Sequence, residues 1–356
     1  MTKKAIGWAA GLIVALGAGG YVLARYNTNS MAHVIYQKVA HTNSVDTDFL
    51  RPKKGPAKVD TDASLKSIRK DLTDENYTGA YVIARNGKVS QTYFTGKNAG
   101  QMDGKFYLAT DTENMLTAAA ILHLVDQGKL KLSTPINEYY SLLSTPDRVT
   151  VRSLLNMTSG LSNNSVPSDQ LSNVLNWNID HAEAGSTGQY DYQEVNYVLL
   201  EGIISQVTNQ SYRSYITDTF LKPNGLTGVK FVSQIDNDKL ATPYNDRHAV
   251  SNSTVTKAMN SQMGRNQLVA TPKAMLRLTQ FLIKNYGNNP NFTGSQPTGR
   301  LIKKGTMYYA SGKVTGYRTA VAVSQDGKTG VVLMSNDSNG KDGLTALVKK
   351  LFNNLK

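Results

Sequence analysis

The sequence contains no cysteine among its 356 residues. This absence excludes disulfides, thiolate nucleophiles, iron–sulfur clusters and cysteine-ligated zinc. Histidine is scarce as well, and the five histidines form no H-x-x-x-H pair, which argues against a zinc hydrolase. The G-x-S-x-G elbow, the phosphate-binding P-loop and the G-x-G-x-x-G fingerprint are also missing. We therefore expect neither a metal nor another cofactor.

Acidic residues are in deficit, with 26 Asp and Glu against 39 Lys and Arg, so the formal net charge is +13. A basic protein favours an anionic partner, either nucleic acid or an anionic envelope polymer. The N-terminal segment helps to decide between nucleic acid and an envelope polymer as the partner. Lys3 and Lys4 precede an uncharged run over 5–24, which Arg25 ends. About twenty residues at about 1.5 Å each just span a bilayer core.

Basic residues next to a membrane segment stay on the cytoplasmic side, so Lys3 and Lys4 would lie inside the cell and the rest of the chain outside it. We therefore predict a signal anchor over 1–24, at the outer face of the cell membrane. Cleavage after Ala24, at the small-residue site Val22-Leu23-Ala24, would instead give a secreted protein. Either form argues against nucleic acid and favours a cell-wall polymer in a Gram-positive envelope. The sequence leaves the oligomeric state open.

Beyond this segment the sequence predicts a polar, basic stalk over 25–60 and a folded domain over 61–356. Asn86-Gly87 joins two strand-like runs near the start of the domain, and Asp326-Gly327 joins two more near its end. Between them, helical periodicity dominates, notably over 115–125, 199–207 and 275–283. We therefore predict an α+β fold. An antiparallel sheet built from both ends of the domain carries flanking helices and an inserted helical subdomain over roughly 111–300.

Several stretches, in this order, resemble the penicillin-recognising serine hydrolases: class C β-lactamases, D-alanyl-D-alanine carboxypeptidases and related esterases. The most specific stretch is VRSLLNMTSGL over 151–161. The others are FYLA over 106–109, LTAAAIL over 116–122, VDQGKL over 125–130, the stretch from Tyr192 to Leu200, QLVAT over 267–271 and the stretch from Tyr309 to Tyr317. The resemblance covers nearly the whole predicted domain and implies the β-lactamase/transpeptidase-like fold.

Three small motifs carry the chemistry of that family, and this sequence departs from each. The resemblance places S-x-x-K, a serine with a lysine one helical turn later, on Thr110 and Glu113. It places Y-x-N on Tyr192 and Glu194, so that the tyrosine is kept and the amide is lost. The closing-strand motif, K-T-G or H-x-G, has its ligand-binding positions at the following residues: Ser311, Gly312, Lys313 and Thr315.

Thr110 and Glu113 allow two interpretations. Thr110 could attack a carbonyl if Glu113, with a raised pKa, served as its base. Alternatively, T-x-x-E at the start of an apolar helix is a capping box, in which each side chain binds the backbone N–H of the other residue. A hydroxyl used as a cap is poorly placed for attack.

The remaining substitutions also allow two interpretations. Glu113 and Glu194 would share one cleft with Tyr192, and two close carboxylates raise the pKa of one of them. Ser311, Lys313 and Thr315 would share a face of one strand, so Lys313 could pair with a glutamate in a fixed network. Alternatively, an acidic cleft could accept the ammonium of a D-alanyl ester. A register slip of one residue near Lys313 would reverse these orientations.

Three functions remain open. The first is a catalytically impaired member of the family that binds a cell-wall ligand, either D-alanylated teichoic acid or a peptidoglycan fragment. The second is an active acyl hydrolase or esterase that uses Thr110 and Tyr192. The third is a surface interaction protein that uses its basic face.

Overall fold

The computed structural model describes most of the chain after the predicted stalk. The described residues are 63–96, 99–110, 113–143, 145, 148–163, 166, 173–245, 248–294, 301–338 and 344–355. The segments predicted as anchor and stalk, 1–24 and 25–60, lie outside them. Within the described residues, no helix combines the length and the apolar character that a membrane crossing requires.

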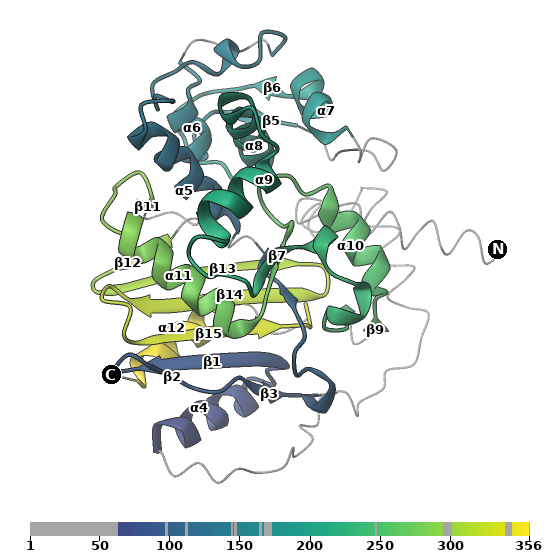
Figure 1. The fold of residues 1–356 in the computed structure, drawn as a ribbon, viewed down its shortest axis with the longest axis vertical. Coiled ribbons are helices and arrows are strands. Elements are labelled where there is room, and N and C mark those ends of the chain that lie inside the picture. The colour runs from purple at the N-terminus through teal and green to yellow at the C-terminus, as the bar shows by residue number, and fades with distance from the viewer. Residues whose placement is uncertain are drawn as a thin grey trace, which may run out of the picture.

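The central sheet takes its strands from both ends of the described chain (Figure 1). Its order is β11-β12-β13-β14-β15-β1-β2, with β3 also paired to β1. The strands are β1 Gly79–Arg85, β2 Lys88–Val89, β3 Tyr93–Thr95, β11 Thr293–Gly294, β12 Leu301–Lys304, β13 Met307–Val314, β14 Tyr317–Ser324 and β15 Gly330–Ser335. All these pairs are antiparallel except β11–β12, and the β1–β15 pair joins the two ends of the chain. The predicted α+β fold is confirmed.

The hairpin turns lie where the sequence predicts them. Asn86 and Gly87 both have positive φ, 52° and 78°, between β1 and β2. Such a pair fits a two-residue turn that matches the twist of the sheet. The strand predicted after this turn is interrupted, because β2 and β3 pair separately with β1 and leave 90–92 outside the ladder.

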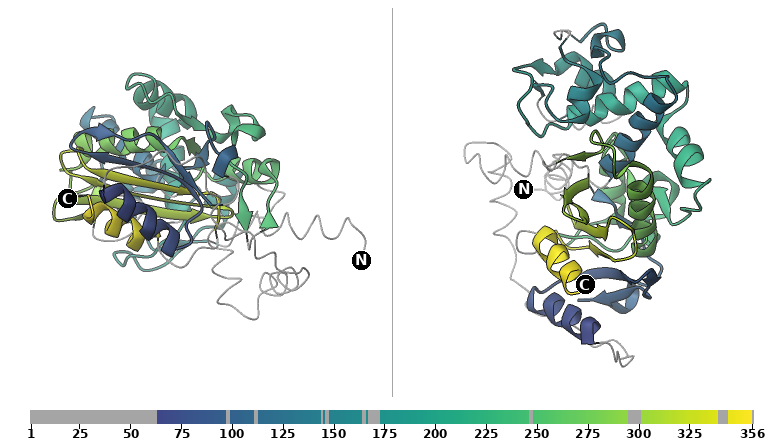
Figure 2. Two further views of the ribbon diagram at one scale, coloured as in Figure 1. Left: turned by 90° about the horizontal axis from the view of Figure 1, so that it is seen from below. Right: turned by 90° about the vertical axis from the view of Figure 1, so that its left-hand side faces the viewer.

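Helices cover both faces of the sheet (Figure 2). Helix α11 (Pro272–Tyr286) lies on one face, and α4 (Ala63–Asp74) and α12 (Leu344–Asn353) lie on the other. Successive side chains of strand β13 point to opposite faces of the sheet. Tyr308 and Ala310 belong to the large core under α11, whereas Met307 and Tyr309 contact the smaller core under α4 and α12. Neighbouring residues of β13 therefore face different layers.

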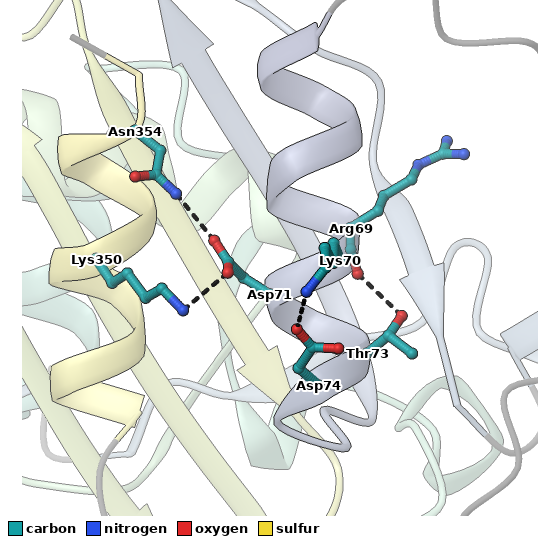
Figure 3. A network of polar contacts seen from close by, with 7 residues as sticks. All are labelled: Arg69, Lys70, Asp71, Thr73, Asp74, Lys350 and Asn354. Atoms are coloured by element: carbon teal, nitrogen blue, oxygen red, sulfur yellow. Dashed lines mark hydrogen bonds and ion pairs between the residues drawn. The ribbon is translucent and has the colours of Figure 1, made fainter.

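The two outer helices are joined through Asp71 of α4 (Figure 3). Its carboxylate accepts a hydrogen bond from Asn354 at 2.9 Å and forms an ion pair with Lys350 of α12 at 2.8 Å. On α4 itself, Lys70 pairs with Asp74 at 2.7 Å in exposed positions. Because Asp71 is mostly buried while Lys70 and Asp74 are exposed, the contacts of Asp71 contribute more to stability than the surface pair.

The helical part lies between β4 and α11 along the chain, with α5 to α8 at the top of Figure 1 and α10 beside the central sheet. Its helices are α5 Glu113–Asp126, α6 Val151–Leu155, α7 Val174–His181, α8 Val195–Thr208, α9 Tyr212–Ile216 and α10 Asn252–Asn260, with the π-turn η6 Thr217–Leu221. The 3-10 turns are η2 Ala99–Gln101, η4 Ile136–Glu138, η7 Val232–Gln234 and η8 Asn237–Lys239. Its short strands are β4 Tyr107–Leu108, β7 Val229–Phe231 and β10 Leu268–Ala270 in one sheet, with the hairpins β5 Leu161–Ser162 with β6 Glu183–Ala184 and β8 Tyr244–Asn245 with β9 His248–Ala249.

Helix α5 is central to this part and is buried over most of its length. The helix ends at Asp126, in agreement with the helical periodicity predicted over 115–125, and Gly128 two residues later has a φ of 70°. The small sheet positions the start of this helix, because β4 leads to it and pairs with β10. Thr319 of β14 fixes β4 to the central sheet by donating a hydrogen bond to the Leu108 carbonyl at 2.8 Å.

Candidate functional site

The first altered motif lies where β4 turns into α5. Thr110 is fully buried, has a φ of 45°, and its hydroxyl makes no hydrogen bond. A residue with this backbone is not in the extended conformation of an N-cap. The predicted capping box is therefore wrong: the Thr110 hydroxyl accepts no hydrogen bond from the Glu113 N–H, and the Glu113 carboxylate accepts one from the Leu268 N–H.

The Glu113 carboxylate points into the protein. Oε2 accepts a hydrogen bond from the Leu268 N–H at 2.8 Å, and Oε1 lies 3.5 Å from the Tyr212 hydroxyl. Tyr212 in turn lies 2.7 Å from the Thr117 hydroxyl, which donates to the Gly264 carbonyl at 2.9 Å. This network links α5, α9 and the segment before β10, so Glu113 is part of a buried polar core and is not placed as a base for Thr110.

Two buried carboxyl groups lie close together, but they are not the predicted pair. Burial, together with the nearby charge of Glu201 of α8, raises the pKa of Glu113 to about 8. Burial also raises the pKa of Glu201 to about 8 against the opposing effects of the Gly264 N–H and Arg213. The predicted raised pKa at Glu113 is therefore present, but its carboxylate neighbour is Glu201 in place of Glu194.

Glu194 carries the second altered motif and is held by an arginine that the sequence analysis missed. It precedes α8, is 31% exposed, and forms an ion pair with Arg265, whose side chain is 2% exposed. Arg265 also donates to Gln262 and lowers the pKa of Glu113 by its charge. The Arg265 guanidinium thus pairs with Glu194 and also acts electrostatically on Glu113. Tyr192 is half-buried and packs against the large core.

The third altered motif follows the prediction only in part: Ser311 and Lys313 share one face of β13 by alternation, but Thr315 lies outside the strand and the shared face is turned away from the large core. The Ser311 hydroxyl lies 2.5 Å from that of Thr345 on α12, which places it on the α4–α12 face of the sheet. Lys313 is two residues further along β13 and pairs in register with Arg318, while Gly312 pairs with Thr319. Thr315 lies in the turn after β13 and not in the strand. Ala310, an apolar residue, takes the position toward the large core.

The hydrogen-bond and ion-pair partners of these side chains determine which chemistry the site can support. Among the described residues, the Thr110 hydroxyl has no base at hydrogen-bond distance. The partly exposed Glu194 carboxylate is already paired with a cation. The described residues also contain no group of three His, Asp or Glu side chains that could hold a metal.

The sequence pattern of the family described as Beta-lactamase matches residues 114–351. A protein described as putative penicillin-binding protein PbpX from Bacillus subtilis is 25% identical over 312 residues, covering 81% of this chain and 78% of that protein. Protein Flp from Staphylococcus aureus is 31% identical over 189 residues, or 46% of this chain and 37% of Flp. The chain thus spans about a third of Flp.

Solved structures show the same fold. FmtA from Staphylococcus aureus superposes with a TM-score of 0.68 at 19% identity, covering 86% of this chain and 93% of that chain. The D-amino acid amidase from Ochrobactrum anthropi gives a TM-score of 0.69 at 18% identity, with 82% and 98% covered. The predicted β-lactamase/transpeptidase-like fold is confirmed.

Proposed function

Because this chain belongs to the Beta-lactamase family, we propose that it is a cell-envelope member that binds its ligand without forming an acyl-enzyme. The observation that carries this proposal is the state of Thr110, which is buried and whose hydroxyl has no hydrogen-bond partner, while the Glu113 carboxylate accepts a hydrogen bond from the Leu268 N–H. Nucleophilic catalysis requires a base within hydrogen-bond reach of the attacking group.

We propose a cell-wall ligand, either D-alanylated teichoic acid or a peptidoglycan fragment. The net charge of +13 and the predicted N-terminal anchor support a place at the outer face of the membrane. Glu194 remains partly exposed beside Arg265, so a ligand ammonium group would compete with the guanidinium for its carboxylate. Binding that is unchanged in Glu194→Gln would count against a D-alanyl ester.

An active acyl hydrolase using Thr110 and Tyr192 is the second candidate. The left-handed backbone of Thr110 favours it, because strained residues other than glycine concentrate at functional sites. This candidate requires a rearrangement that exposes the hydroxyl and brings a base to it.

Intact mass spectrometry separates the two candidates. We expect the full chain to show no adduct after incubation with a penicillin or with an activated acyl ester, while a penicillin-reactive serine enzyme in the same buffer is fully modified. Circular dichroism on the same sample shows that the chain is folded. An adduct that maps to Thr110 and disappears in Thr110→Ala would overturn the non-acylating proposal.

A further inference from the structure

The basic charge of the chain is concentrated in one stretch. Residues 247–325 contain no Asp or Glu and eleven Lys and Arg. The rest of the chain carries the other 28 Lys and Arg and all 26 Asp and Glu, so it is nearly neutral. Nearly all of the net charge of +13 therefore comes from a segment that includes α10, β10, α11 and the strands β11 to β14.

Helix α11 displays part of this charge as a row. Lys273, Arg277 and Lys284 are all exposed, while the opposite side of the helix packs on the sheet. Spacings of four and seven residues return to the same side of an α-helix, at about 6 Å and about 10 Å along its axis. The three cations therefore line one edge of the helix on a rigid support.

Three turns extend the row at the end of the sheet near the C-terminal half of α11. Gln280 of α11 donates to the Gly327 carbonyl at 2.7 Å. The Gln325 N–H donates to Thr306 at 2.8 Å, and the Gly87 N–H donates to Lys328 at 2.9 Å. The turns between β1 and β2, β12 and β13, and β14 and β15 therefore lie side by side.

These segments form what we call the basic surface. Its exposed cations are Lys273, Arg277, Lys284, Lys303 and Lys328. The exposed Arg85, Lys88 and Lys304 belong to the opposite face of the sheet by strand alternation, because Arg85 pairs with Lys88 two residues after Ile83 of the smaller core, and Lys304 pairs with Met307 of that core. Asp326 is the single acidic residue in these segments, and its carboxylate accepts hydrogen bonds from the Ser324 hydroxyl and the Lys328 N–H. Asp126 of α5 borders the surface, where its charge acts on Tyr286 of α11.

We propose that the basic surface docks a linear phosphodiester polyanion, of which poly(glycerol phosphate) is the simplest example. The row arrangement favours a polymer over a membrane, because membrane-binding faces add apolar side chains that enter the lipid. Among the described residues, the large apolar side chains that stand exposed are Val89 and Leu142, and of these only Val89 adjoins the surface. A polyanion binds through its phosphates alone.

This surface is distinct from the candidate site. Thr319, which holds β4 and thus the start of α5, lies five residues from the end of β14 at Ser324. At about 3.3 Å per residue, this separates the turns of the basic surface from β4 by roughly 17 Å, whereas Lys273, at the start of the row, follows the end of β10 by three residues. No cation of the surface is a residue of the candidate site, so polyanion docking does not depend on the proposed function of the cleft.

The test compares two triple variants of the full chain that have equal net charge. Lys273→Gln/Arg277→Gln/Lys284→Gln removes the α11 row. Lys66→Gln/Lys239→Gln/Lys257→Gln removes three exposed cations from α4, η8 and α10. Binding of delipidated poly(glycerol phosphate) is measured by titration calorimetry between 50 and 200 mM salt, and circular dichroism confirms that both variants fold.

We expect the α11 variant to lose at least tenfold in affinity at 50 mM salt and the control to lose less than threefold. With about 0.7 released counterions per contact on a single-stranded polyanion, the slope of log K against log salt becomes shallower by about 2. Equal losses in both variants, or no loss in either, would overturn the proposal. So would a loss seen only with phosphatidylglycerol vesicles or single-stranded DNA and not with the polymer.

Discussion

The free energy of unfolding is expected to fall as the pH rises from 5.5 to 7.5, by several kcal/mol. The cause is the buried carboxyl pair of Glu113 and Glu201. Each has a pKa of about 8 in the folded protein because burial disfavours the charged form, whereas an unfolded glutamate titrates near 4.5. Between these values the folded chain holds protons that the unfolded chain has released.

Proton linkage explains why the free energy of unfolding falls as the pH rises. Where the unfolded state binds fewer protons than the folded state, unfolding becomes easier with rising pH. The stability that protonated Glu113 and Glu201 contribute is thus fully present below pH 4.5 and is lost as the pH passes through 8. Each carboxyl contributes roughly 1 to 2 kcal/mol per pH unit in this window.

Urea unfolding at pH 5.5 and 7.5 measures the effect, and amide variants assign it. Glu113→Gln keeps an oxygen for the Leu268 N–H and mimics the protonated acid. We expect it to reduce the pH dependence by about half and to be more stable than the unmodified chain at pH 8.5. Glu201→Gln should act similarly. Glu183→Gln changes an exposed carboxylate and should leave the dependence as it is. A slope unaltered in both buried variants would contradict the assignment.

Much of the fold is predictable because its signals are local and follow one another in a fixed order. Asn86-Gly87 sets a turn by its backbone preference, and the apolar periodicity of α5 and α8 requires burial on both helices. The break between β2 and β3 has no such signal. It arises from pairing with β1, which no property of 88–95 alone determines.

The site is less predictable because the direction of a side chain depends on register and tertiary contacts. Ser311 illustrates this point, since one step along β13 separates it from the face that Ala310 occupies. Arg265 carries no motif, and its role depends on the approach of Glu194 from α8, 71 residues away along the chain. Thr110 and Glu113 have the spacing of a capping box, but the Leu268 N–H offers the carboxylate a buried donor from β10.

Gly264 holds the segment that joins these side chains, and Gly264→Ala is expected to destabilise the protein by roughly 2 to 5 kcal/mol. Its φ is 70°, and an added Cβ would lie 2.4 Å from the Tyr197 carbonyl oxygen. The left-handed backbone costs a residue with a Cβ about 1 to 2 kcal/mol, and the overlap adds about 1 to 3 kcal/mol. Gly264 also accepts a hydrogen bond from Thr117 and donates one to Glu201, so relief of the overlap disturbs both.

Gly225→Ala is the matched control, because Gly225 has a φ of 63° and no atom within 4 Å of an added Cβ. This variant should lose only the stability that its left-handed backbone costs, about 1 to 2 kcal/mol. Urea unfolding of both variants isolates the contact with Tyr197 as the difference between them. Equal losses would mean that the α8 backbone moves aside without cost and that the segment before β10 is not held firmly against it. A larger loss in Gly264→Ala, together with a weakened pH dependence, would show that the close approach of this segment to α8 maintains the burial of Glu113 and Glu201.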